Sequence, residues 1–129
     1  MTFLARPSVA IGFGAFFLCA ATCAHFDELS TPWGLVPDWT AGMILVAGAV
    51  VSRRDWDTGR EYQIAAWAFM VSLLFLSFLD NFQDWLSQSP GATGSSGLVS
   101  MPQGPYTIVV GTLLAVAVAG LLGSLRARD

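Results

Sequence analysis

The side chains of this sequence that can bind a metal or exchange protons follow two apolar stretches. His25, Asp27 and Glu28 come directly after the first stretch, and Asp80 and Asp84 come after the third. Asp80 and Asp84 are one helical turn apart, which places them on one face of a helix. Clustered carboxylates suit Ca²⁺, Mg²⁺ or Mn²⁺, and an added imidazole brings zinc or iron into range. If these helix ends converge, we expect a metal site, or a carboxylate pair that acts beside a histidine in acid–base catalysis.

The same acidic residues also have a simpler interpretation. Asp38 begins the second apolar stretch, so acids accompany several stretches on what would be one side of a membrane. That side is acidic when the basic residues are kept on the opposite one. The spacing of the carboxylates matches no regular ligand motif. We therefore expect a hydrated acidic rim unless a divalent ion is shown to stabilise the protein.

Cys19 and Cys23 are the two cysteines of the chain and lie one helical turn apart. They share one helix face, where they are poorly oriented to form a disulfide with each other. His25 lies about 240° around the helix from Cys19, because each residue turns a helix by about 100°. These three residues therefore make a poor metal site, and we expect the cysteines to act as small apolar side chains.

No apolar stretch carries an ionisable side chain in its middle. An acidic or basic residue inside the membrane is the usual mark of ion coupling or of a proton relay. The lack of one argues against a proton-coupled exporter and leaves no candidate catalytic residue within the spans. The sequence favours a protein that is not an enzyme, and it specifies no cofactor.

Four apolar stretches have to position these residues. Apolar residues make up 54% of the 129-residue chain and charged residues 12%, and the mean hydropathy is +0.60. A soluble domain is usually about one quarter charged. We expect a single all-α domain, a four-transmembrane-helix bundle built as two up-down hairpins. Its spans are expected over residues 8–25, 37–52, 61–79 and 106–125, with an outer loop over residues 80–105.

Local signals mark the third span and leave the first one open. Thr58 and Glu61 have the spacing of a capping box, which predicts the start of the third span. Residues 80–86 are amphipathic and are expected to extend the third helix along the membrane surface. The first stretch also fits a cleavable signal peptide, with Arg6 in its basic region and Ala24 before the cut.

The distribution of arginine predicts the orientation in the membrane. Basic residues precede the first span, separate the second from the third and follow the fourth, whereas the other connections carry acids. Loops rich in arginine face the cytoplasm, so both termini are expected there, in a membrane such as the bacterial inner membrane. No basic patch stands clear of acids, which argues against a nucleic-acid partner. The six arginines are Arg6, Arg53, Arg54, Arg60, Arg126 and Arg128.

The tryptophan and tyrosine residues lie at or near the expected span ends. Tryptophan and tyrosine are typical of the headgroup level of a bilayer, where one edge of the ring meets water. We therefore interpret all of them as membrane-interface anchors. They are Trp33, Trp39, Trp56, Tyr62, Trp67, Trp85 and Tyr106.

Small residues recur every four positions in two spans. Such a stripe lets another helix approach closely, because it removes side-chain bulk. We expect it to pack against a helix of this chain or of another one. The partners are then the lipid bilayer and other membrane helices, in a homo-oligomer or a larger complex. The packing residues are Gly111, Ala115, Ala119 and Gly123 in the fourth span, with Gly48 and Ser52 in the second.

Two functions fit these features. Clean apolar spans and a packing stripe favour a structural or accessory helical module, which packs against itself or a larger membrane complex. The alternative is an outward-facing site for metal-dependent chemistry or small-solute permeation at the acidic outer mouth. The long segment over residues 87–104 is rich in serine, glycine and proline, and it is either a lid over that mouth or a loose tether.

Overall fold

The computed structural model describes residue 3, residues 6–26, residue 29, residues 32–87, residues 93–95 and residues 101–127. It contains four long helices, which confirms the all-α prediction. A short 3₁₀ turn and two short strands, paired antiparallel, accompany them. The helices are α1 (Pro7–Ala24), α2 (Val36–Arg54), α3 (Trp56–Ser87) and α4 (Gln103–Arg126), the turn is η3 (Pro32–Gly34), and the strands are β1 (Thr93–Ser95) and β2 (Met101–Pro102).

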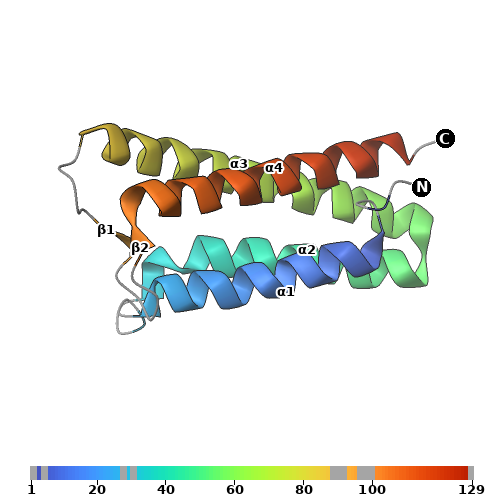
Figure 1. The fold of residues 1–129 in the computed structure, drawn as a ribbon. Coiled ribbons are helices and arrows are strands. Elements are labelled where there is room, and N and C mark those ends of the chain that lie inside the picture. The colour runs from blue at the N-terminus through green and yellow to red at the C-terminus, as the bar shows by residue number, and fades with distance from the viewer. Residues whose placement is uncertain are drawn as a thin grey trace.

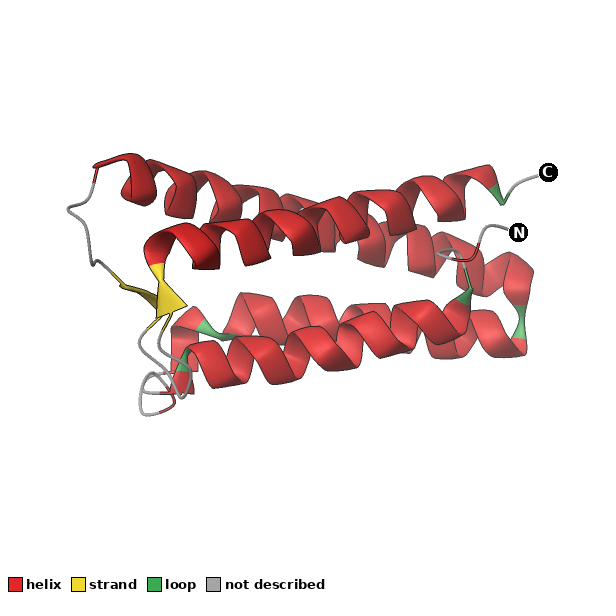
Figure 2. Cartoon of the chain, viewed as in Figure 1, coloured by secondary structure: helices red, strands yellow, loops and turns green. Residues whose placement is uncertain are grey.

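The helices form two antiparallel hairpins, α1 with α2 and α3 with α4 (Figure 1). The end of α1 and the start of α2 lie at the same end of the molecule as the start of α4. Among the described residues, extensive helix contacts join α1 to α2, α2 to α3 and α3 to α4. Helices α1 and α4 are thus the first and last helices in this packing order, and no extensive contact joins them among the described residues. The two chain ends and the α2–α3 corner lie together, and the β strands lie at the opposite end (Figures 1 and 2).

Asp55 forms the corner between α2 and α3. Its backbone N–H donates to the carbonyl of Val51 at 3.0 Å, which closes α2. Its carboxylate accepts the N–H of Asp57 at 3.2 Å and the hydroxyl of Thr58 at 2.7 Å. These bonds satisfy donors of the first turn of α3, so Asp55 is its N-cap. The predicted capping box was therefore wrong, because Thr58 lies inside the helix.

Helices α2 and α3 approach closely on both sides of this corner. A Cβ atom placed on Gly59 would lie 2.2 Å from the backbone N of Ser52, and one on Gly48 would lie 3.2 Å from the carbonyl O of Tyr62. Backbones at this distance leave no room for a side chain on the glycine. Gly48 and Ser52 are both buried, so the small residues predicted for the second span lie on the side of α2 that faces α3.

Trp67 forms the centre of the core. It is fully buried, and its ring centroid lies 5.3 Å from that of Phe13 on α1. The prediction that Trp67 anchors the membrane interface was therefore wrong. Helix α3 begins at Trp56, earlier than expected, so Trp67 lies three turns inside it. Residues of the other helices then surround the indole and shield it from lipid and water.

The far end of the second hairpin is held by side-chain hydrogen bonds. Helix α3 runs unbroken for 32 residues, which is about 48 Å at 1.5 Å per residue. Near its end, Asn81 accepts bonds from Gln103 Nε2 at its side-chain oxygen (2.9 Å) and at its carbonyl (3.1 Å). Thr107 Oγ1 also donates to the Asn81 carbonyl at 3.2 Å. The start of α4 is thereby fixed against α3.

Within the part of the chain that the structure describes, three helices are long and apolar enough to cross a membrane: α1, α3 and α4. Their outer surfaces carry large apolar side chains, among them Phe16, Leu76, Ile108 and Leu122. Large exposed apolar surfaces mark sites of interaction with a membrane or with another protein. These helices indicate an integral membrane protein.

Candidate ligand cavity

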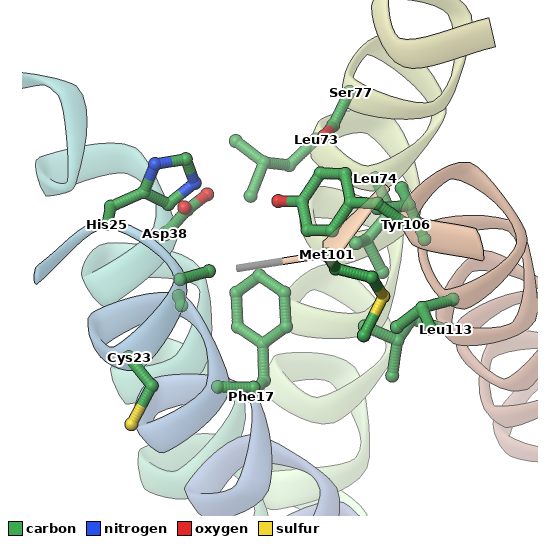
Figure 3. A pocket seen from close by; sticks show the side chains of 15 residues that line it. Phe17, Cys23, His25, Asp38, Leu73, Leu74, Ser77, Met101, Tyr106 and Leu113 are labelled. Atoms are coloured by element: carbon green, nitrogen blue, oxygen red, sulfur yellow. The ribbon is translucent and has the colours of Figure 1, made fainter. Parts of the chain in front are cut away.

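A cavity of about 230 Å³ lies between the two hairpins (Figure 3). Its lining comes from the end of α1 and the first part of α4, in the half of the molecule away from the chain ends (Figure 1). Its walls come from α1, α3 and α4, with Asp38 of α2 and Met101 of β2 at its edge. It is bounded by α1 and α4, the two helices at the ends of the packing series. Part of the cavity is open because the α1 residues that line it there have small side chains: Ala20, Ala21 and Ala24.

Most of the cavity surface is apolar. The side chains of Phe17, Leu74 and Val110 are each at most 5% exposed, so they belong to the core as well as to the cavity wall. Leu73, Met101 and Leu113 complete the apolar lining (Figure 3). An apolar space of this kind favours hydrocarbon over water.

Polar groups gather at one end of the cavity. The side chains of His25 and Asp38 point toward each other there, one from the end of α1 and the other from the first turn of α2 (Figure 3). The hydroxyl of Tyr106 points toward the same end from the opposite wall. A carboxylate is favoured in the first turn of a helix, because the helix dipole is positive there. The cavity therefore has an apolar body and a polar mouth.

A hydrogen bond between α1 and α2 positions one side of this mouth. Trp39 Nε1 donates to Thr22 Oγ1 at 3.0 Å, and Thr22 Oγ1 donates to the carbonyl of Leu18 at 2.8 Å. These bonds fix the end of α1 against the start of α2, and hence His25 relative to Asp38. The sequence pattern predicts only an interface anchor at Trp39, and the structure adds this hydrogen bond. Thr22, a hydroxyl inside an apolar span, was the available sign of this contact.

The residues predicted to bind a metal are only partly placed. His25 lines the cavity, whereas Asp80 and Asp84 are exposed on α3 outside the described lining. Asp27 and Glu28 lie outside the described residues. Within the described part of the chain, no group of three or more His, Cys, Asp or Glu residues is placed to hold a metal ion. The structure brings His25 and Asp38 together (Figure 3), and the metal site stays a prediction.

The cysteines are free and exposed on the surface of the chain. Cys23 borders the cavity, but its sulfur points away from the space (Figure 3). Cys19 is one turn further from the mouth. Both thiols are thus on the outer surface of the bundle and not beside His25.

Helix α4 packs on α3 through residues next to the predicted stripe. Gly120 and Ala117 are fully or almost fully buried, and a Cβ atom on Gly111 would lie 3.1 Å from the Phe78 ring. Within the stripe, Gly123 is buried, Ala119 is half-buried and Ala115 is exposed. The stripe therefore runs from the α3 contact onto the free surface of α4. Its packing role stays a prediction.

Comparisons with protein-family models, curated proteins and solved structures found no match to this chain. Ligand sites are commonly apolar spaces with a few polar groups that fix orientation. An apolar body with a polar mouth suits an amphipathic molecule.

Proposed function

We propose that this protein is a four-span membrane protein with both termini in the cytoplasm, and that it acts as a small accessory module that binds a lipid-soluble molecule in the cavity. The observation that carries the proposal is the cavity itself, with its apolar walls and with polar groups at one end. Its position between α1 and α4 supports entry from the bilayer, because these two helices are not joined by an extensive contact within the described residues.

The fourth span of this proposal is α2. Its 19 residues measure about 28 Å, close to the roughly 30 Å of a bilayer core. Asp38 at one end and Arg53 and Arg54 at the other reduce its average hydropathy. All three lie where a spanning helix meets the headgroups. Contacts with α1 and α3 cover α2 on two sides, so it needs less apolar surface than a helix surrounded by lipid.

The proposed orientation follows the charges of the two ends. The end that holds the chain termini carries Arg6, Arg53, Arg54 and Arg126 on its surface. Arg60 Nε also lies there and donates to the carbonyl of Ser124 at 3.3 Å. The opposite end carries Asp38, Asp80 and Asp84. Arginine-rich ends face the cytoplasm, so the cavity mouth is proposed to lie in the outer half of the membrane.

The accessory role is proposed from the free surface of the bundle. Among the described elements, the extensive contacts of α4 with another helix are with α3 alone, and Ala115 is exposed on its free side. A small residue there permits close approach by a helix of a second chain. Metal-dependent chemistry and solute permeation gain no support from the cavity, because its lining is largely apolar.

A cavity-filling variant tests the binding function. The full chain is purified in a mild detergent, and bound molecules are extracted and measured by mass spectrometry. Ala20→Phe places a ring in the cavity, whereas Ala15→Phe makes the same change on the exposed surface of the same helix. We expect the wild type and Ala15→Phe to retain an apolar molecule and Ala20→Phe to lose most of it. Equal amounts in both variants, or no molecule in any of them, would contradict the proposal.

A further inference from the structure

We infer that Met101 of β2 sets the size of the apolar molecule that the cavity accepts. This assignment rests on the proposed binding function and adds the residue that determines its selectivity. It is drawn from the shape of the cavity, from the position of the Met101 side chain in it and from the way the chain holds this residue there.

The cavity is elongated along the helices. Its lining on α1 extends from Phe17 to Ala24, and its lining on α4 extends from Tyr106 to Leu113. Each of these segments rises about 10 Å, at 1.5 Å per residue. A protein cavity of roughly 150 Å³ holds benzene, so the present cavity of about 230 Å³ holds a ring with a short chain. In a cavity this small, one side chain changes the size of the molecule that fits.

Met101 differs from the rest of the lining in the element that carries it. Among the described lining residues it alone lies on a strand, whereas the others lie on the long helices or at the end of α1. The helix residues Phe17, Leu74 and Val110 are at most 5% exposed and also form the core. Met101 is only half-buried. A change at this position therefore alters the cavity with little effect on the packing of the bundle.

The side chain of Met101 takes up part of the cavity. In Figure 3 it lies between Phe17 of α1 and Leu113 of α4, and all three residues line the space. A methionine side chain is unbranched and has three rotatable bonds, so it fills irregular apolar gaps and adjusts to its neighbours. A shorter side chain here leaves more volume for a ligand, and a larger one leaves less.

The backbone of Met101 is held on both sides. The next residue is Pro102, and a residue before proline favours an extended conformation. In this conformation Met101 lies opposite Ser95 of β1. Gln103 then begins α4, and its Nε2 donates to the side-chain oxygen of Asn81 at 2.9 Å. The strand therefore keeps Met101 at the cavity, and the size of its side chain determines how much space remains.

A series of alkylbenzenes of increasing chain length tests the assignment. The full chain is purified in a mild detergent, and the dissociation constant of each probe is obtained from the rise in unfolding temperature with probe concentration. The constants refer to free probe in water, after its partition into the micelles has been measured. We expect the affinity of the wild type to rise about fourfold for each added methylene, up to a limiting length, and then to stop rising.

Variants at position 101 should move this limit in opposite directions. Met101→Ala removes the side chain beyond Cβ, so the limiting length should grow by about three carbon atoms. Met101→Phe fills the space and should lower the affinity for the longest probe that the wild type accepts by about tenfold or more. Met43→Ala, at an exposed position on α2, is the matched control and should keep the limit of the wild type.

The outcomes separate this assignment from the proposed function. A limiting length that is the same in both Met101 variants and in Met43→Ala would overturn the role of Met101 and leave the binding function intact. Affinity that rises with chain length without a limit in the wild type would also overturn it, because the chain then leaves the cavity without meeting Met101. Probes that bind the wild type no better than Ala20→Phe, in which the cavity is filled, would overturn the proposed function itself.

Discussion

Trp67 lies directly against Gly120, with no room for a side chain between α3 and α4. A Cβ atom on Gly120 would be 2.7 Å from both Cε2 and Cζ2 of the indole. Real Cβ atoms do not approach carbon this closely, so any larger residue has to displace the ring. The indole is fully buried and also contacts Phe13 of α1. Trp67 therefore packs against α4 of its own hairpin and against α1 of the other. It couples the two hairpins, and the cavity between them depends on how they pack.

Gly120→Ala is expected to lower the free energy of unfolding by about 1–3 kcal/mol, because the added methyl group overpacks the core. Gly12→Ala is the matched control: it lies on α1, and a Cβ atom there meets nothing within 4 Å among the described residues. Alanine favours a helix over glycine by up to about 1 kcal/mol, so this control should be neutral or slightly stabilising. Thermal unfolding in detergent measures both. A Gly120→Ala variant as stable as Gly12→Ala would contradict this packing.

The Asp55 cap predicts a dependence of stability on pH. The hydroxyl of Thr58 and the nearby backbone N–H groups hold the pKa of Asp55 below its ordinary value of 3.8. A carboxylate with a lowered pKa in the folded state stabilises it above the unfolded pKa, and this contribution is lost as the pH falls through the folded pKa. We expect unfolding temperatures to fall below about pH 4, and Thr58→Val to make that fall shallower. An unchanged pH profile in Thr58→Val would show that this bond has no such effect.

Much of the helical framework follows from local sequence features. Hydropathy located all four helices, and the structure places His25 and Asp38 beside the same cavity. The start of α3 was misplaced because Thr58 and Glu61 match a capping box, whereas Asp55 satisfies the same first turn from three residues earlier. The residue types alone do not show whether Asp55 or Thr58 caps the helix, because both can accept hydrogen bonds from a first turn.

The cavity was not predictable in the same way. It depends on α1 and α4 remaining apart while α2 and α3 pack closely, and this is a relationship between residues far apart in the chain. Trp67 was assigned to the interface because tryptophan is common there. Its contact with Gly120 joins residues more than fifty positions apart. Tyr106 was given the same role, and its place beside the mouth depends on how α4 is held by Asn81.

A second chain at the free side of α4 is tested by Ala115→Ile. We expect this change to weaken association in detergent by about tenfold, or about 1.4 kcal/mol, because the larger side chain holds the partner helix away. Association is measured by chemical crosslinking and light scattering over a range of protein concentrations. Ala15→Ile, on the exposed surface of α1, should leave association unchanged. Equal behaviour of the two variants would make the stripe incidental.

The proposed topology predicts the location of reporter fusions. Fusions after residue 57 and at the C-terminus should be active in the cytoplasm, and a fusion near residue 94 should be active outside it. This pattern follows from an even number of spans with the arginine-rich end inside. An external C-terminus would imply an odd number of spans and would contradict the assignment of α2 as a span.

Photolabelling tests the central claim, that the cavity holds a lipid-soluble molecule, most directly. An apolar probe with a diazirine is added to membranes that contain the full chain, and the labelled residues are identified by peptide mass spectrometry. We predict concentrated labelling of Phe17, Met101 and Leu113 that an excess of unlabelled apolar ligand suppresses. Labelling confined to the outward-facing Phe16, Leu76 and Leu122 and unaffected by competitor would contradict the claim.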